Sequence, residues 1–456
     1  MASHVVDSEI FKDIFGSAAM RAVFSDEGLV RRWLQVEAAL ARAEAKLGVI
    51  PEWAAAEISR KAVPENIDLE RLRAETELVG YPILPLVRQL AQACEGGAGE
   101  YIHWGATTQD IMDTAMVLQL KDALGLIRDG LVELEDRLAT LAEAYRDTPM
   151  AGRTHGQQAL PITFGYKVAV WLAETHRHLK RLAELEGRVL VGQLGGAVGT
   201  LAAVGERGLE IQRLFLKELG LGVPEIAWHV ARDRVAEVVC FLGLLTATLG
   251  KIAQEIALLS RTELAEVREP FAAGRGASST MPQKSNPIGA EAVIALTKVV
   301  RQQVPIALDA MVQDGERGTG PWLAEWECVP EAFILTAGAL SQLNRILGGL
   351  EVDVNRMARN LGLSGGLIMA EAVVMALAPQ LGRQRAHELV YAACRRAEAE
   401  GLSLVEVLRA DPELTRHLEA GDLKRLLDPD GYVGVAGAFV DRVVGLVRKD
   451  REVIKL

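Results

Sequence analysis

The chain has 456 residues, a formal net charge of −11 and a hydrophobic content of 50%. This length predicts about three domains, and the apolar fraction predicts a sizeable core rather than intrinsic disorder. The acidic balance argues against nucleic acid or a membrane surface as the partner, because both are anionic. A small anionic substrate is compatible with it, since a pocket can gather cations while the outer surface stays acidic.

Cysteine usage and the apolar runs predict a soluble, cytoplasmic protein. The four cysteines are far apart and form no CxxC pair, which favours reduced and mostly buried thiols. The first residues, MASHVVDSEIFKDIFG, have no basic end followed by an apolar core, so we expect no signal peptide. The longest apolar run, VVCFLGLLTATLG, stops at Lys251 and is too short to cross a bilayer.

Apolar residues recur at helical spacing along most of the chain. The pattern predicts long helices over residues 26–49, 113–146, 161–191 and 232–264, and proline at position 161 suits a first helical turn. At 1.5 Å per residue, such helices would be roughly 50 Å long. No segment of comparable length alternates as a strand would, so the sequence predicts an all-α protein.

Helices of this length, apolar on more than one face, need neighbours on several sides. They predict a bundle shared between the subunits of a homo-oligomer, with a large monomeric bundle as the alternative. The stretch CEGGAGEY (94–101) interrupts the first region, and the composition changes again near residue 350. We therefore expect an N-terminal helical domain (1–112), a central bundle of long helices (113–350) and a C-terminal helical domain (351–456).

The stretch GRGASSTMPQKSNP (274–287) combines loop residues with groups that can do chemistry. These groups are Ser278, Ser279, Lys284 and Asn286. It is not a Walker-type phosphate loop, because it lacks the Lys-Ser/Thr pair and follows a helix rather than a strand. Asn286 and Pro287 read as the N-cap and first residue of a helix, whose positive end would lie near the hydroxyls. Spacing alone leaves a plain linker and a mobile catalytic loop about equally favoured.

A serine hydroxyl is a poor base in water. It becomes a base only where cationic charge and backbone N–H groups stabilise its alkoxide in a dry site. The glycines at positions 274 and 276 would let the loop close over a substrate and expel water.

Two further stretches place polar side chains at predicted helix starts. In YIHWGATTQDIMDTA (101–115), Thr107, Thr108 and Gln109 suit carboxylate binding at a helix N-terminus, although a plain N-cap is the simpler explanation. In GRTHGQQALPITFG (152–165), Thr154, His155 and Gln157 precede the predicted helix. A histidine flanked by small and polar residues is a candidate for acid–base work. His176 and His178 fall on a polar helix face, where we expect them to be solvated.

The stretch DGERGTGPWLAEWE (314–327) adds Arg317, which could grip a substrate carboxylate with both arms of its guanidinium. An ion pair with Glu316 or Glu325 is at least as good an explanation. No HExxH, paired cysteines or acidic triplet at metal-ligand spacing occurs, and no GxGxxG follows a strand. The sequence therefore predicts chemistry without a metal or cofactor.

Together these stretches resemble the fumarase/aspartase superfamily. Its members share a GSSxMPxKxNP loop, matched by ASSTMPQKSNP (277–287), a GRTHxQxAxP stretch, matched by GRTHGQQALP, and a segment matched by TTQD. Within it, the 3-carboxy-cis,cis-muconate cycloisomerase branch resembles nearly the whole chain, with adenylosuccinate lyase next nearest. The RYxxxxM opening of adenylosuccinate lyase is missing here. The chain also departs from the cycloisomerase branch, which commonly has Trp in place of His155 and MPHKRNP in the loop.

The resemblance implies an all-α subunit of three domains and a homotetramer in which three subunits build each active site. It makes Ser278 the base in the elimination direction and His155 an acid or a residue that positions one. Lys284 and Asn286 would hold a substrate carboxylate. The further predicted contacts are Thr107, Thr108, Gln109, Thr154, Gln157, Ser279 and Arg317.

The expected reaction needs these residue types. Removing a proton beside a carboxylate creates an enolate-like dianion, which fixed donors and cations must stabilise. Lactone formation is the same chemistry run as addition: a carboxylate attacks a double bond and the neighbouring carbon takes a proton. Two other readings stay open: a C–N lyase that releases fumarate from an amino-substituted succinate, and a non-catalytic helical assembly protein.

Overall fold

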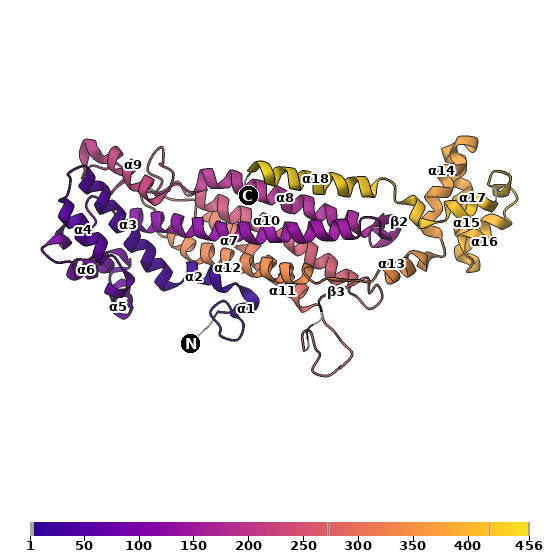
Figure 1. Cartoon of the computed structure of the whole chain (residues 1–456), viewed down its shortest axis with the longest axis horizontal. Helices are drawn as coiled ribbons and strands as arrows, with labels where there is room; N and C mark the ends of the chain where they lie inside the picture. Colours follow the sequence, from indigo (N-terminus) through magenta and orange to yellow (C-terminus); the bar gives the residue numbers. More distant parts are fainter. Residues whose placement is uncertain (1–3, 271, 273, 419, 455–456) are drawn as a thin grey trace. The chain divides into compact units, whose positions relative to one another are not determined.

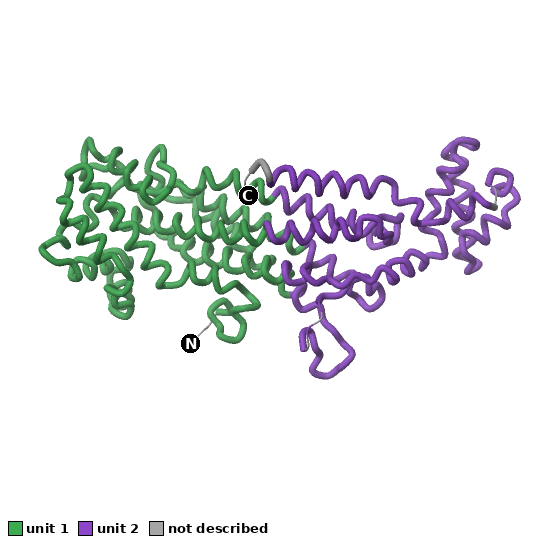
Figure 2. The backbone as a smooth tube through the Cα atoms, viewed as in Figure 1, with its two compact units in different colours: residues 1–131, 178–250, 292–342 green, residues 132–177, 251–291, 343–456 purple. Residues whose placement is uncertain are grey.

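The computed structural model describes residues 4–270, 272, 274–418 and 420–454, and helices dominate it (Figure 1). The Cα positions divide the chain into two compact units (Figure 2). Unit 1 comprises residues 1–131, 178–250 and 292–342, and unit 2 comprises residues 132–177, 251–291 and 343–456. The expected division into three domains at residues 112 and 350 stays a prediction.

Long helices form the framework and contribute residues to both units. They are α7 (Thr108–Ala144), α8 (Phe164–Val189), α10 (Asp233–Leu259), α11 (Ile288–Asp309) and α12 (Pro321–Leu347). The helical periodicity of the sequence is confirmed in α7 and α10, whose apolar positions are mostly buried. The prediction of an all-α protein from the apolar pattern is therefore confirmed.

The rest of unit 1 is built on α3 (Asp26–Lys46). Ser25 caps its start by accepting from Gly28 N at 3.1 Å, as N-cap serines do. The chain leaves the helix at Gly48, whose φ of +66° favours glycine. The other helices of the unit are α1 (Lys12–Phe15), α2 (Ala18–Val23), α4 (Glu52–Lys61), α5 (Leu69–Val79), α6 (Ile83–Ala93) and α9 (Gly208–Leu219).

Unit 2 ends in a set of shorter helices with a core of their own. Val373, Leu377, Val390, Leu404 and Val407 lie at its centre and are buried. The helices that supply this core are α14 (Ala370–Leu381), α15 (Arg383–Glu400), α16 (Leu404–Ala410) and α17 (Ala420–Leu426). They are preceded by α13 (Val354–Leu361) and followed by α18 (Ala436–Ile454). These helices follow the change in composition noted near residue 350 in the sequence.

The prediction that a helix begins at Pro161 is wrong, because residues 149–163 form a β-hairpin. Its strands are β1 (Pro149–Thr154) and β2 (Gln157–Thr163), and α8 begins only at Phe164. Thr154 pairs with Gln157, which leaves His155 and Gly156 as a two-residue turn with φ of 51° and 78°. Two successive positive φ values define the turn type that matches the twist of a hairpin. A second small sheet pairs β3 (Val267–Arg268) with β4 (Glu351–Val352).

The helix α10 is longer than the apolar run considered in the sequence. It passes a test of length and composition for a membrane-spanning helix, and 61% of its most apolar window is buried. A core helix of a globular protein has the same signature. Within the described residues the four cysteines are free thiols, and burial raises the pKa of Cys328 to about 12.

Candidate functional site

The serine loop belongs to unit 2 and connects β3 to α11 (Figure 1). Its base is closed by an antiparallel bridge between Ala277 and Ser285. The backbone N–H and the side-chain amide of Asn286 both donate to Gly276 O, at 3.0 and 3.2 Å. The two ends of the loop are therefore tied together, while Ser279 and Lys284 remain exposed between them.

Asn286 was predicted to cap the next helix, and this prediction is wrong. The carboxylate of Glu269 accepts from Gly289 N at 3.1 Å and from Ala290 N at 2.7 Å, and α11 starts at Ile288. The negative carboxylate of Glu269 suits the positive end of a helix better than the neutral side-chain amide of Asn286, which already donates to Gly276 O. Glu269 also lies 3.4 Å from Arg275. The local sequence does not identify Glu269 as the cap of α11, because Glu269 precedes the whole loop.

Ser278 sits in a polar turn that points two backbone donors at its hydroxyl. Its Oγ accepts from Thr280 N at 3.2 Å and from Met281 N at 3.0 Å, and the residue is half-buried. These donors remain in place when the hydroxyl loses its proton, and they then bind the negative oxygen more strongly. The loop therefore supplies the backbone N–H groups that a serine base needs, and the cation Lys284 lies on the same loop.

The closed base of the loop makes Gly276 sensitive to substitution. Its φ is +69°, and a Cβ at this position would lie 2.5 Å from Asn286 O. We expect Gly276→Ala to lower kcat by more than tenfold, because the base must open and Ser278 shifts with it. The melting temperature should hardly change, since the loop adds little to the core. A matched Gly274→Ala variant, where a Cβ meets nothing within 4 Å, should lose less activity; equal losses in both variants would contradict the argument.

The hairpin of unit 2 presents three predicted site residues at its tip. Thr154, His155 and Gln157 are all exposed. Behind the tip, Arg153 grips the buried carboxylate of Glu266 through two bonds of 3.0 and 2.7 Å. This ion pair anchors the hairpin to the unit. The two-residue turn therefore places His155 at the exposed end of an anchored hairpin.

In unit 1 the start of α7 is organised by Asp110, which is fully buried. Its two oxygens accept from the N–H groups of Thr107, Gly195 and Gly196 at 2.8 to 3.0 Å. One oxygen also binds Nε2 of His229 at 2.8 Å. The sequence pointed to this stretch but not to Asp110 as its centre, because the partners lie about 85 and 119 residues away. Asp110 thus fixes the backbone that carries Thr107 and Thr108.

Gln109 and Arg317, predicted separately, are in direct contact. Oε1 of Gln109 accepts from Nε of Arg317 at 3.0 Å, and its Nε2 donates to His229 O at 2.9 Å. Nη1 of Arg317 donates to Ala197 O at 2.9 Å. The alternative of an Arg317–Glu325 ion pair is wrong, because Glu325 binds another arginine. In the described part of the chain Arg317 forms no salt bridge, so its charge is available to a ligand.

That other arginine, Arg232, is 1% exposed and lies between two buried carboxylates. It binds Asp113 at 2.7 Å and Glu325 at 2.9 Å. Burial lowers the pKa of Arg232, but the two carboxylates outweigh it and raise the pKa overall. Asp113 also accepts from Nε1 of Trp322 at 3.2 Å, at the start of the helix that follows Arg317. The cluster ties the segment that carries Arg317 to α7.

His176 and His178 were expected to be solvated, and both are 2% exposed. Nδ1 of His176 binds Glu135 at 2.7 Å, and its Nε2 binds Asp450 at 2.9 Å. His178 binds the hydroxyl of Thr248 at 3.0 Å. For His176 the expectation failed because α18, far away in sequence, supplies Asp450; for His178 it failed because α10 supplies Thr248. A local polar pattern cannot distinguish solvent from a buried polar network.

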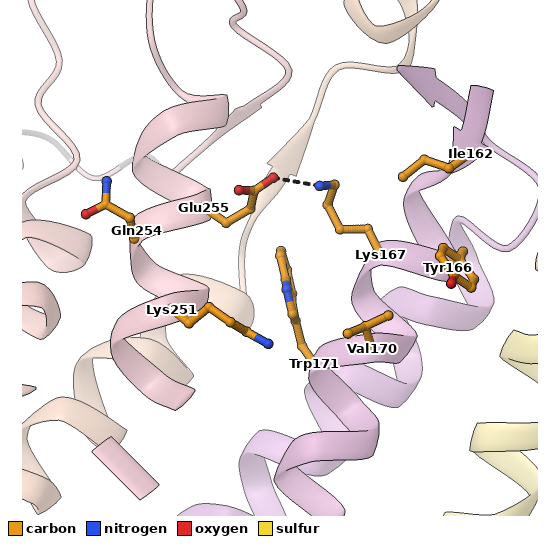
Figure 3. A pocket seen from close by; sticks show the side chains of 8 residues that line it. All are labelled: Ile162, Tyr166, Lys167, Val170, Trp171, Lys251, Gln254 and Glu255. Carbon is orange, nitrogen blue, oxygen red and sulfur yellow. Dashed lines mark hydrogen bonds and ion pairs between the residues drawn. The ribbon is translucent and has the colours of Figure 1, made fainter. Parts of the chain in front are cut away.

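A hollow of about 380 Å³ in unit 2 contains none of the predicted site residues. It is lined by Tyr166, Lys167 and Trp171 of α8 and by Lys251, Gln254 and Glu255 of α10, with Ile162 and Val170 (Figure 3). Lys167 reaches Glu255 at 2.6 Å. Lys251 likewise reaches Glu174 at 2.5 Å, so both lysines that line the hollow are paired within the unit. Across the described residues no cluster of His, Cys, Asp or Glu has the arrangement of a metal site.

Comparison with known proteins identifies the family. Residues 16–302 match the model described as "Lyase", and residues 366–443 match "Adenylosuccinate lyase C-terminus". The chain belongs to this lyase family, within the fumarase/aspartase superfamily, and is an enzyme. The resemblance inferred from the three motifs is confirmed, and with it the fold class.

Individual relatives are similar over nearly their whole length. The chain is 46% identical to 3-carboxy-cis,cis-muconate cycloisomerase of Pseudomonas aeruginosa over 97% of each chain. It is 47% identical to trans-aconitate decarboxylase 1 of Mycosarcoma maydis, over 95% of this chain and 88% of the relative. The crystal structure of the 3-carboxy-cis,cis-muconate lactonizing enzyme from Pseudomonas putida superposes with a TM-score of 0.92 at 43% identity, covering 97% and 99% of the two chains.

Proposed function

We propose that this enzyme is a cofactor-independent cycloisomerase or lyase acting on a carboxylate-rich substrate, best matched by 3-carboxy-cis,cis-muconate. The observation that carries the chemistry is the Ser278 hydroxyl with two backbone N–H groups pointed at its oxygen. The substrate class is supported by the cycloisomerase of Pseudomonas aeruginosa and the lactonizing enzyme of Pseudomonas putida, both similar over nearly the whole chain.

In the proposed mechanism one carboxylate of the substrate attacks a double bond within the same molecule. The electrons of that bond move toward a neighbouring carboxylate and form an enolate-like dianion. Lys284 and Arg317 would stabilise this charge, and the adjacent carbon then takes a proton. Ser278 is the proton-transfer group, acting as the base when the reaction runs as an elimination. His155 would supply the acid or orient it.

The remaining site residues would bind and orient the carboxylates. Thr107, Thr108, Thr154, Gln157 and Ser279 offer hydroxyl and amide groups for direct contact. Gln109 and Asn286 act differently, because their amides are already bonded to Arg317 and to Gly276 O. In this proposal Gln109 orients the arginine, and Asn286 keeps the serine loop in shape.

We also propose a homotetramer in the cytoplasm, with each active site built from three subunits. The exposed hairpin tip with His155 and the exposed Lys284 support this arrangement. Both could reach groups on neighbouring copies. Free cysteines are consistent with a reducing compartment.

A substrate panel tests the proposal. The purified protein would be incubated with 3-carboxy-cis,cis-muconate, trans-aconitate and amino-substituted succinates, and followed by ultraviolet absorbance and by CO₂ release. We expect the muconate absorbance to fall through lactone formation, with no fumarate from the succinates. Fumarate from a succinate with inert carboxymuconate would instead establish a C–N lyase.

A second candidate activity follows from the relative in Mycosarcoma maydis, which is named for decarboxylation of trans-aconitate. Carbon dioxide release also leaves an enolate-like anion, so the same cations would serve it. Evolution of CO₂ from trans-aconitate without lactone formation would favour this activity. If none of these compounds reacts or raises the melting temperature, the proposed substrate class is wrong.

A further inference from the structure

The buried histidine His176 lies between two carboxylates that come from different helices of unit 2. Its Nδ1 lies 2.7 Å from Oε1 of Glu135 on α7, and its Nε2 lies 2.9 Å from Oδ2 of Asp450 on α18. His176 and Glu135 are 2% and 0% exposed, whereas the side chain of Asp450 is 19% exposed. The proposed reaction leaves this cluster without a role.

The number of protons that this arrangement needs follows from hydrogen-bond chemistry. A neutral imidazole has one N–H donor and one nitrogen lone pair, and an ionised carboxylate offers only acceptors. A neutral ring at position 176 would therefore bring a lone pair against a carboxylate oxygen in a buried site. An imidazolium has two N–H donors and satisfies both contacts. The geometry thus calls for one proton more than a neutral histidine and two carboxylates carry.

Arg451 on α18 indicates that this proton lies on the ring rather than on a carboxylate. Its Nε donates to Oε2 of Glu135 at 2.6 Å, so Glu135 binds a guanidinium and the imidazole through separate oxygens. Arg451 also contacts Asp136, and its Nη2 donates to Val132 O at 3.0 Å. A carboxylate that accepts two charge-assisted hydrogen bonds suits its ionised form. A buried charge is tolerated where it is paired and hydrogen-bonded, and the ring of His176 has an anion at each nitrogen.

The other long helix that contacts α8, α10, directs its polar groups elsewhere. Lys251 of α10 pairs with Glu174 at 2.5 Å, and Thr248 binds His178 at 3.0 Å through a neutral hydroxyl. Among the residues that the structure describes, the charged partners of His176 are therefore the two carboxylates from α7 and α18.

The contact with His176 fastens the C-terminal part of α18, residues 444–451, to α8 (Figure 1). Nearer its start, α18 is held by Phe439, which packs on Tyr166 with ring centroids 6.0 Å apart, and by an exposed ion pair between Asp441 and Arg146. Side chains of these types do not ordinarily titrate near neutral pH. A change of protonation at His176 would therefore act on the end of the helix and leave its start in place.

We propose that His176 is a proton-dependent latch for the C-terminal part of α18. The imidazolium joins the carboxylates of Glu135 and Asp450. Loss of its proton leaves one nitrogen facing a carboxylate without a hydrogen, and residues 444–451 then separate from α8. The latched state binds one proton more than the open state, so the open fraction grows as pH rises, by up to about tenfold per pH unit.

Hydrogen exchange followed by mass spectrometry measures the latch. The readout is the protection of the amides of residues 444–451, corrected for the intrinsic exchange rate, at pH values on both sides of about 6.5, where a free histidine titrates. In the wild type we expect this protection to fall by roughly 10- to 100-fold as pH rises, the usual contribution of a charge-assisted hydrogen bond. The amides of residues 439–443 should change little.

The central variant is Asp450→Asn. The amide of asparagine can donate to the lone pair of a neutral ring, whose other nitrogen then donates to Glu135. The contact therefore survives deprotonation, and residues 444–451 should stay protected at high pH. The matched control is Asp441→Asn, the same chemical change on the same helix, which removes an exposed ion pair. This control should keep the pH dependence of the wild type.

Each outcome decides. Wild-type protection of residues 444–451 that does not fall as pH rises would overturn the latch, and so would the same pH dependence in Asp450→Asn and in the wild type. If Asp450→Asn does not fold, His176→Gln takes its place: an amide cannot titrate, so a pH dependence that persists in this variant overturns the proposal. No readout involves turnover, so failure of the latch leaves the proposed polycarboxylate function intact.

Discussion

Replacing Ser278 with alanine is expected to lower kcat by roughly 100- to 10,000-fold, the usual range for removing a group that transfers a proton. The hydroxyl is lost, while the two N–H groups of Thr280 and Met281 stay in place. Substrate affinity should therefore change much less than turnover. The measurement is steady-state kinetics on the substrate that the panel identifies, together with the melting temperature and the oligomeric state.

The matched control is Ser285→Ala on the same loop. Ser285 is exposed and pairs with Ala277 only through its backbone, so its side chain is dispensable for the bridge. We expect Ser285→Ala to keep nearly full activity. Turnover by Ser278→Ala at close to the wild-type rate would remove the serine from the mechanism.

The largest expected effect on stability belongs to Arg232→Met. Removing the guanidinium leaves the carboxylates of Asp113 and Glu325 buried with no cation between them. Breaking a buried ion pair from one side typically costs about 3–5 kcal/mol of unfolding free energy. Urea unfolding followed by circular dichroism would measure this loss.

An exposed arginine provides the comparison for Arg232. Arg188 pairs with Glu237 at the surface, where solvent screens the charges. Arg188→Met should therefore shift the urea midpoint only slightly. Similar losses of unfolding free energy in the two variants would mean that the buried Arg232 ion pairs stabilise the fold no more than an exposed ion pair does.

The sequence predicted what depends on local spacing and on motifs. Periodic apolar positions located α7 and α10, and the three motifs located the serine loop and the family. It did not predict partners that are distant along the chain: Glu269 at the start of α11, Asp110 with Gly195 and Gly196, or Asp450 on His176. Each of these contacts depends on how helices pack, which a single sequence pattern does not contain.

The hairpin was missed for a different reason. Pro161 at a helix start is a sound statistical expectation, but Pro161 here lies in a strand opposite Ala151. The informative signal was His-Gly, because glycine in second place favours the two-residue turns of hairpins. Tertiary pairing along β1 and β2 then overrode the helical preference of the following segment.

The turn at residues 155 and 156 also restricts how this enzyme can diversify. A side chain at position 155 must accept a backbone geometry that penalises branched and bulky residues by about 1 kcal/mol or more. Branched or bulky replacements at this position therefore lower the stability unless the turn itself changes shape. Insertions or deletions at the hairpin tip, rather than point changes alone, would be the freer route for remodelling this tip.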